Sequence, residues 1–378
     1  MTSRGVSSES QTRFTRRRRL LQWLAGWVMS ENAVAQHRLE QPRLTQYRAV
    51  TPGYRVRFPA DEGSHPAFRT EWWYVTGWLD APGRDAMGFQ ITFFRTRPRI
   101  DERNPSAFAA REIMIAHAAL SDTRRGRLLH DQRVARSVFE LAGAQIGRTN
   151  AWIDDWSLVQ EGAAYRAQIP AGEFRFDLAF TQTQPPLLQG DEGLSRKGPR
   201  AESASYYYSI PQLEVTGTIA ESGRPVEVTG KAWLDHEWSS SYMDEHAVGW
   251  DWIGLNMHDG GALMAFRMRD SRGAALWAGG AYRDAAGLRR TFAPADVQFT
   301  ALRNWRSPRT GATYPVAWRV RAGALELTLE PLMDDQESDT RASVGAVYWE
   351  GAVRAMADGK LAGRGYLELT GYARPLRL

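Results

Sequence analysis

The feature that most limits the possible folds is a series of short segments in which apolar and polar residues alternate. Segments of this kind lie at residues 88–94, 212–219 and 324–329. Successive side chains of a β-strand point to opposite faces, so a period of two predicts strands with one buried face. Turns rich in Gly and Asp separate such segments, for example at residues 258–261 and 284–287. This spacing is typical of antiparallel hairpins.

The chain is therefore expected to be all-β, and only residues 101–112 look helical. Many hairpins with little helix predict a sandwich or a closed barrel, and closure removes exposed strand edges. The length of 378 residues gives room for about two domains. We place an N-terminal domain at residues 45–238 and a C-terminal domain at 247–378, separated by a polar, serine-rich segment. A Pro- and Gly-rich stretch at 183–204 is expected to form a long loop or lid.

The N-terminus has the pattern of an export signal. Four arginines at residues 16–19 precede an apolar run at 20–29, and Ala33 and Ala35 then form a small-x-small cleavage site. The run is too short for a bilayer-spanning helix, which needs roughly twenty residues. The arginines and the leucines after them also resemble a twin-arginine signal. We expect a leader at residues 1–35 and a periplasmic or secreted mature chain, the alternative being a basic amphipathic arm.

Removal of this leader would leave a nearly neutral chain. The formal net charge is +5, and residues 1–35 contribute +4 of it through six arginines and two glutamates. A nucleic-acid-binding protein needs a clustered basic surface, so nucleic acid is not an expected partner. No later stretch reaches roughly eighteen apolar residues, so no membrane span is expected in the mature chain. The chain has no Cys, which excludes disulfides and thiolate chemistry.

Aromatic and acidic residues gather in four short clusters. They lie at residues 71–74 (EWWY), 206–208 (YYY), 235–238 (DHEW) and 250–252 (WDW). Residues i and i+2 of a strand share a face, which predicts pairs of side chains: His236 with Trp238, Asp235 with Glu237, Trp250 with Trp252, and Trp72 with Tyr74. A cavity lined by aromatic groups with a few polar ones is the usual site for an apolar ligand. Filling of a barrel core is the alternative for any single one of the 15 Trp residues.

These clusters supply the candidate functional residues. His236 is either a general acid/base or ligand-orienting group, or a hydrogen-bonded core histidine. Glu237 and Asp235 could set its charge. Asp251 is a candidate proton donor if it points inward, where burial would raise its pKa. The candidate ligand-binding residues are the aromatic members of the clusters: Trp72, Trp73, Tyr74, Tyr206, Tyr208, Trp238, Trp250 and Trp252.

Other chemistries find little support in the sequence. Folding could bring His236, Glu237, His246 and His258 together, but no HExxH or similar metal-binding spacing is present. No Gly-x-Ser-x-Gly nucleophile elbow occurs. No Gly-rich phosphate loop follows a predicted strand. We therefore expect neither a metal nor an organic cofactor.

Five spaced motifs together resemble the AttH/carotenoid 1,2-hydratase family. They lie at residues 71–77, 206–209, 217–219, 230–238 and 249–252, and the resemblance covers roughly residues 50–375. It implies two lipocalin-like barrels side by side. It also implies an export signal, as in many AttH-type members, and ABC-transporter components as partners.

The resemblance implies two alternative functions. The first is an exported lipocalin-like protein that binds a lipid, polyene or isoprenoid in a Trp-rich cavity. The second is a cofactor-free enzyme, a hydro-lyase or an isomerase/cyclase: in the hydratase branch an acid protonates the terminal double bond of an acyclic carotenoid and water captures the carbocation. His236 and Trp238 match the family's His-x-aromatic positions. Residues 263–266 lack the carboxylate expected there, so Asp251 or Glu71 would have to be the acid.

Overall fold

The computed structural model describes residues 44–221 and 223–376, and the predicted leader at residues 1–35 lies outside them. The fold is all-β, as predicted, and consists of two antiparallel sheets. Helical elements of the described chain are short 3₁₀ turns at Ala60–Glu62 (η1), Thr123–Arg125 (η2) and Pro294–Asp296 (η3). No helix in this part of the chain is long and apolar enough to cross a membrane.

The expected helix at residues 101–112 is wrong, because this segment forms turns and irregular backbone. Pro105 explains the failure. A proline disfavours the helical conformation of the residue before it, here Asn104, and cannot donate a backbone hydrogen bond itself.

The chain divides into two compact units. Among the described residues, Leu44 and residues 101–103 belong to one unit, and residues 45–100, 104–221 and 223–376 belong to the other. Both sheets, and all side chains discussed below, belong to the second unit.

The first sheet has thirteen strands, in the order β4-β3-β2-β1-β13-β12-β9-β8-β7-β6-β5, with β10 and β11 paired to β12. The strands are β1 (Thr70–Asp80), β2 (Met87–Thr96), β3 (Ile113–Ser121), β4 (Leu128–Arg136), β5 (Ala142–Ala144), β6 (Asn150–Ile153), β7 (Trp156–Glu161), β8 (Ala164–Pro170), β9 (Phe174–Thr181), β10 (Leu187–Leu188), β11 (Leu194–Arg196), β12 (Ala204–Glu221) and β13 (Arg224–Ser241). The long loop predicted at 183–204 therefore contains two short strands, β10 and β11.

The second sheet has ten strands, in the order β17-β16-β15-β14-β23-β22-β20-β19-β18, with β21 paired to β22. The strands are β14 (Gly249–Met257), β15 (Ala262–Arg269), β16 (Ala275–Arg283), β17 (Arg289–Phe292), β18 (Val297–Arg306), β19 (Thr313–Ala322), β20 (Leu325–Pro331), β21 (Glu337–Thr340), β22 (Ala346–Ala357) and β23 (Lys360–Leu369). The chain passes from one sheet to the other between Ser241 and Gly249.

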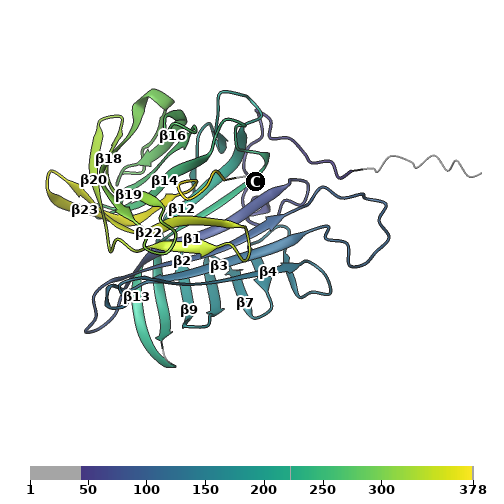
Figure 1. Ribbon diagram of the computed structural model, residues 1–378, viewed down its shortest axis with the longest axis horizontal. Helices are drawn as coiled ribbons and strands as arrows, with labels where there is room; N and C mark the ends of the chain where they lie inside the picture. Colours follow the sequence, from purple (N-terminus) through teal and green to yellow (C-terminus); the bar gives the residue numbers. More distant parts are fainter. Residues whose placement is uncertain (1–43, 222, 377–378) are drawn as a thin grey trace, which may run out of the picture. The chain divides into compact units, whose positions relative to one another are not determined.

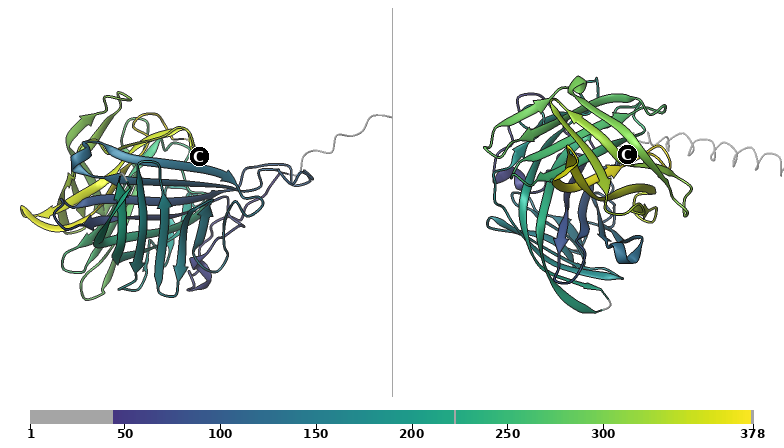
Figure 2. Two further views of the ribbon diagram at one scale, coloured as in Figure 1. Left: turned by 90° about the horizontal axis from the view of Figure 1, so that it is seen from below. Right: turned by 90° about the vertical axis from the view of Figure 1, so that its left-hand side faces the viewer.

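Each sheet curves around an apolar core, and a third core lies between the sheets. Figure 1 shows the green and yellow strands of the second sheet lying against the blue and teal strands of the first, and Figure 2 shows this arrangement from two further sides. Hydrogen bonds tie the sheets together: the Trp78 indole donates to the Gly365 carbonyl at 3.0 Å, and the Asn256 amide donates to the Ala232 carbonyl at 3.0 Å. Where the second sheet covers the first, at β1 and the second half of β13, both faces of the first sheet are buried. A site can therefore lie on either side there.

Candidate functional site

The motif residues of β1 and β13 alternate between the two faces of the first sheet. On the outer face, Tyr74 lies opposite Asp235 and Trp72 lies opposite Glu237, and all four line a cavity between the sheets. The inner face carries a second set of motif residues, next to them in sequence: Glu71, Trp73, Tyr206, Tyr208, His236 and Trp238. The pairs predicted from the period of two therefore form, but they belong to two separate environments.

The inner-face set surrounds a buried carboxylate, Glu71. Its Oε1 lies 2.9 Å from His236 Nε2 and 2.6 Å from His65 Nδ1. Its Oε2 accepts a hydrogen bond from Arg95 Nε at 2.8 Å. The second ring nitrogen of His236 lies 3.1 Å from the Tyr208 hydroxyl. Glu71, Arg95 and His236 are completely buried.

Electrostatics favour the charged form of this carboxylate. Burial opposes ionisation, but the charge of Arg95 and the hydrogen bonds from both histidines hold the pKa of Glu71 well below its usual value. Burial lowers the pKa of His236. For His65, hydrogen bonds to Asp61 and Glu71 outweigh burial and raise the pKa. This cluster is a satisfied ionic network rather than a proton donor, since Glu71 stays ionised.

Three residues of this network have the chemistry of metal ligands. One ligand atom each from His65, Glu71 and His236 lies within 4.8 Å of the others. These atoms already hydrogen-bond to one another, and Arg95 adds a positive charge at 2.8 Å from the carboxylate. The ring of His65 also stacks on Trp238 with centroids 3.8 Å apart. A bound cation would have to displace these contacts and face Arg95. Of the set suggested by the sequence, His236, Glu237, His246 and His258, only His236 belongs to this trio.

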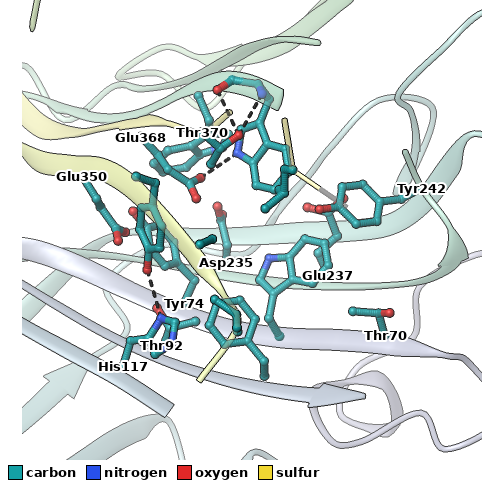
Figure 3. Close-up of a pocket in the computed structure, with 18 of the residues that line it drawn as sticks. Thr70, Tyr74, Thr92, His117, Asp235, Glu237, Tyr242, Glu350, Glu368 and Thr370 are labelled. Carbon is teal, nitrogen blue, oxygen red and sulfur yellow. Dashed lines mark hydrogen bonds between the residues drawn. The ribbon is translucent and has the colours of Figure 1, made fainter. Parts of the chain in front are cut away.

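The outer face lines a cavity of about 330 Å³ between the two sheets. Figure 3 shows side chains of both sheets converging on it. Its aromatic lining residues are Trp72, Tyr74, Phe94, Tyr207, Tyr242, Trp250, Trp252, Phe266 and Tyr348. Its volume and apolar lining fall in the range of small-molecule sites.

A pair of glutamates, the buried Glu350 and the half-buried Glu368, lies in the wall of this cavity. Glu350 of β22 and Glu368 of β23 are directly opposite each other in the sheet, and both line the cavity. Glu368 accepts a hydrogen bond from the Trp250 indole at 2.8 Å. Within the described residues, Glu350 Oε1 and the nearby Tyr74 hydroxyl have no hydrogen-bond partner. Figure 3 shows Glu350 and Glu368 on the side of the cavity away from Thr70 and Tyr242.

This pair holds a proton at neutral pH. Burial, and then the negative charge of Glu368, raises the pKa of Glu350 well above its usual value. Burial also raises the pKa of Glu368, to about 7. Two neighbouring buried carboxyls cannot both ionise at low cost, so they present at least one acidic O–H to the cavity.

Asp235 is a third carboxyl in the cavity wall, held by three donors. The Tyr207 hydroxyl, the Ser209 hydroxyl and the Trp233 indole each donate to it at 2.6 Å. Burial raises its pKa to about 7 despite these hydrogen bonds. The Trp252 indole donates to the Tyr207 hydroxyl at 3.1 Å, so an aromatic side chain from the second sheet is fixed to the same network.

Glu237, in contrast, is paired with a cation. Lys197 Nζ lies 3.0 Å from Glu237 Oε1, and the ammonium group also lies 4.7 Å from the Tyr207 ring centroid and 4.3 Å from that of Phe266. Ser205 donates a hydrogen bond to the same oxygen. Lys197 follows β11 in the segment predicted as a loop or lid. The carboxylate of Glu237 is therefore already held by an ammonium group and a hydroxyl group.

Asp251 lies outside the cavity. Trp250 and Trp252 face the cavity, so alternation turns Asp251 to the other side of β14. There its carboxylate accepts hydrogen bonds from Arg267 Nε at 2.5 Å and Arg269 Nε at 3.0 Å. Of the two orientations left open by the sequence, the structure adopts the one with inward tryptophans. Asp251 therefore cannot reach a ligand in the cavity, and the structure does not support the role considered for it.

A comparison with known protein families identifies the family of this chain. The family model described as AttH-like matches residues 49–372. The chain belongs to the AttH-like family. Curated proteins give no match to the sequence.

Two solved structures resemble this AttH-like chain. A crystal structure of a protein described as an AttH from Nitrosomonas europaea is 52% identical, covers 86% of this chain and 99% of its own, and has a TM-score of 0.81. Kievitone hydratase from Nectria haematococca is 15% identical, covers 88% of this chain and 98% of its own, and has a TM-score of 0.64. At that identity the second likeness concerns the fold alone.

The structure also supplies cavity carboxylates that sequence reasoning missed. The segment 263–266 of β15 lacks an acid, but Glu350 and Glu368 reach the cavity from β22 and β23. Each of these glutamates lies within an otherwise apolar strand segment, Glu350 at residues 347–353 and Glu368 at residues 366–369. A charged residue within an otherwise apolar strand was the available signal, because burying a carboxyl is costly unless it is neutral or paired.

Proposed function

We propose that this AttH-like protein binds an elongated apolar molecule of the lipid, polyene or isoprenoid class in the cavity between the sheets. The observation that carries the proposal is the cavity itself, whose wall is largely aromatic and also contains the carboxyl groups of Asp235, Glu350 and Glu368. Apolar ligands bind through such walls, while a few polar groups fix their orientation. The unpartnered Tyr74 hydroxyl and Glu350 Oε1 would meet a polar end or a double bond of the ligand.

A second function, hydration of a carbon–carbon double bond, is favoured by the acid pair. The protonated member of Glu350 and Glu368 would donate its proton to one alkene carbon, which leaves a carbocation at the other. Aromatic faces such as that of Trp252 stabilise a cation. Water then adds to the cation and gives up a proton to the carboxylate just formed, so the pair is restored and one water is consumed. The name of kievitone hydratase, a protein with this fold, accords with this proposal.

The proposal includes export and a transporter partner. The sequence pattern of residues 1–35 supports cleavage of a leader and a periplasmic or secreted location. An exported binding protein for an apolar molecule would deliver it to, or receive it from, an ABC transporter. Fractionation of the native host, with N-terminal sequencing of the mature chain, tests the location.

Ligand binding is tested by titrating the protein with retinol, a polyene whose absorption overlaps tryptophan emission. Trp252→Ala should weaken binding about tenfold or more, because a stacked indole contributes roughly 1.5–3 kcal/mol. Trp305→Ala is the matched control, since Trp305 is half-buried in β18 and does not line the cavity. Equal affinities for both variants would place the site elsewhere.

Hydration is tested separately, with an acyclic polyene in isotopically labelled water. The wild type should form a product that carries one labelled oxygen. Glu350→Gln should form none and still bind retinol, and this combination supports catalysis. Unchanged substrate with every variant supports the binding function alone.

A further inference from the structure

An exposed apolar surface lies at one end of β3 and β4. It comprises Phe108, Val134 and Phe139, which are 63%, 52% and 66% exposed, and we call it the apolar rim. The rings of Phe108 and Phe139 are in edge contact with centroids 5.6 Å apart. The guanidinium of Arg136 donates to the Phe108 carbonyl at 2.9 Å, which fixes this loop against the end of β4. Single exposed apolar residues are ordinary, but grouped ones mark interaction surfaces.

The rim is continuous with the cavity wall. In the register of the first sheet, Trp72 pairs with Phe94, Phe94 with Ile115, and Ile115 with Val134. Paired residues of antiparallel strands share a face, so these four side chains form an apolar stripe across β1 to β4. Trp72, Phe94 and Ile115 line the cavity, and Val134 belongs to the rim.

The cavity opens at the same end of the sheet. Its half-buried lining residues include Arg69 and Thr70, where β1 begins, and Thr96, where β2 ends. Val344, 40% exposed, lines this side as well. Because β3 begins and β4 ends there, the loops that carry Phe108 and Phe139 emerge beside this opening.

Charged side chains of both signs lie around the rim. Arg111 and Arg136 are exposed and hydrogen-bond to backbone carbonyls, and neither forms an ion pair within the described residues. Glu140, next to Phe139, and Asp154, whose backbone N–H donates to the Leu141 carbonyl, are exposed acidic residues. Exposed aromatic side chains with arginines that lack an acidic partner are typical of surfaces that dock on anionic lipid headgroups.

We propose that the apolar rim docks on the surface of an anionic phospholipid bilayer, with Phe108 and Phe139 inserted among the headgroups and acyl chains. Docking there would turn the cavity opening toward the membrane. An apolar ligand could then pass along the stripe between bilayer and cavity without crossing water. This inference rests on the proposed function for its purpose, but docking can be measured with no ligand present.

The test is co-sedimentation of the purified protein with vesicles. One set contains phosphatidylcholine mixed with phosphatidylglycerol, and the other contains phosphatidylcholine alone. The double variant Phe108→Ser/Phe139→Ser should bind the anionic vesicles about tenfold less tightly than the wild type. The matched control is Leu288→Ser/Leu302→Ser, which also removes two exposed apolar side chains, 58% and 46% exposed, and should bind like the wild type.

The outcomes separate docking from ligand binding. Docking is supported if the wild type prefers anionic vesicles, the rim variant loses this preference, and Arg111→Gln/Arg136→Gln reduces it. Equal binding by rim and control variants overturns it, as does binding to neither kind of vesicle. Concentration-dependent dimers that the rim variant abolishes, without vesicle binding, overturn it in favour of a second copy of the chain. The rim variant should keep the wild-type affinity for retinol in solution, so failure of the retinol titration counts against the cavity site alone.

Discussion

Replacement of Glu368 by Gln should stabilise the protein at high pH and not at low pH. Burial raises the pKa of Glu368 from 4.5 to about 7. The folded state therefore keeps a proton that the unfolded state releases. Below pH 4.5 the carboxyl is protonated in both the folded and the unfolded state, so its titration does not change the free energy of unfolding. As the pH rises from 4.5 to about 7, the folded protein loses about 3 kcal/mol relative to the unfolded chain, at about 1.4 kcal/mol for each pH unit, and the loss is complete above pH 7.

The Gln side chain keeps the local hydrogen bonds while removing the titration. Its carbonyl oxygen can accept the hydrogen bond that the Trp250 indole donates to Glu368, and its amide can donate to the unpartnered Glu350 Oε1. The gain in free energy of unfolding over the wild type should therefore grow by about 2–3 kcal/mol between pH 5 and pH 8.

Urea denaturation at several pH values measures this difference. Met268→Leu is the control, since Met268 also lines the cavity and has no titratable group. It should shift the free energy of unfolding by the same amount at each pH. Parallel curves for Glu368→Gln and the wild type would show that this carboxyl titrates as it does in water, and would refute the protonated acid pair.

Three further predictions follow from the same contacts. Glu71→Gln should lower the free energy of unfolding, measured by urea denaturation, by about 3 kcal/mol or more, because Arg95 loses its buried carboxylate partner. A loss below about 1 kcal/mol would contradict the ionic network. Gly88→Ala should cost about 1–3 kcal/mol in the same assay, since its Cβ would lie 2.5 Å from Ala352 Cβ of the other sheet. Wild-type stability after this change would mean that the sheets approach less closely. If the protein hydrates a polyene, kcat should fall as the pH rises above about 7, where Glu368 loses its proton; a rate that increases with pH would indicate a base instead.

The alternation of the sequence predicted the fold and the pairs of neighbouring side chains well. The period of two at β1 and β13 put Trp72 with Tyr74 and His236 with Trp238, and these pairs occur. It could not show that the first pair faces the second sheet while the other pair faces the barrel interior. Both faces of β1 and of the second half of β13 are buried, so the usual contrast between an apolar and a polar face is missing there.

The acid groups were harder to predict, because they depend on contacts between distant parts of the chain. Glu71 meets its neutralising partner Arg95 only through pairing of β1 with β2. Asp251 meets Arg267 through pairing of β14 with β15. Glu350 and Glu368 become an acid pair because β22 and β23 place them side by side in the wall of a largely aromatic cavity. Burial and pairing set the pKa of a carboxyl, and local sequence reveals neither.

The central claim is that an apolar ligand binds in the cavity between the sheets. The most direct test is to purify the protein from its native host, extract it with organic solvent and identify the extracted molecules by mass spectrometry. The wild type should yield a lipid, polyene or isoprenoid, or its hydrated product, and Trp252→Ala should yield much less while Trp305→Ala matches the wild type. Equal amounts of ligand from all three proteins, or no ligand from any, would contradict the assignment of this cavity as the binding site.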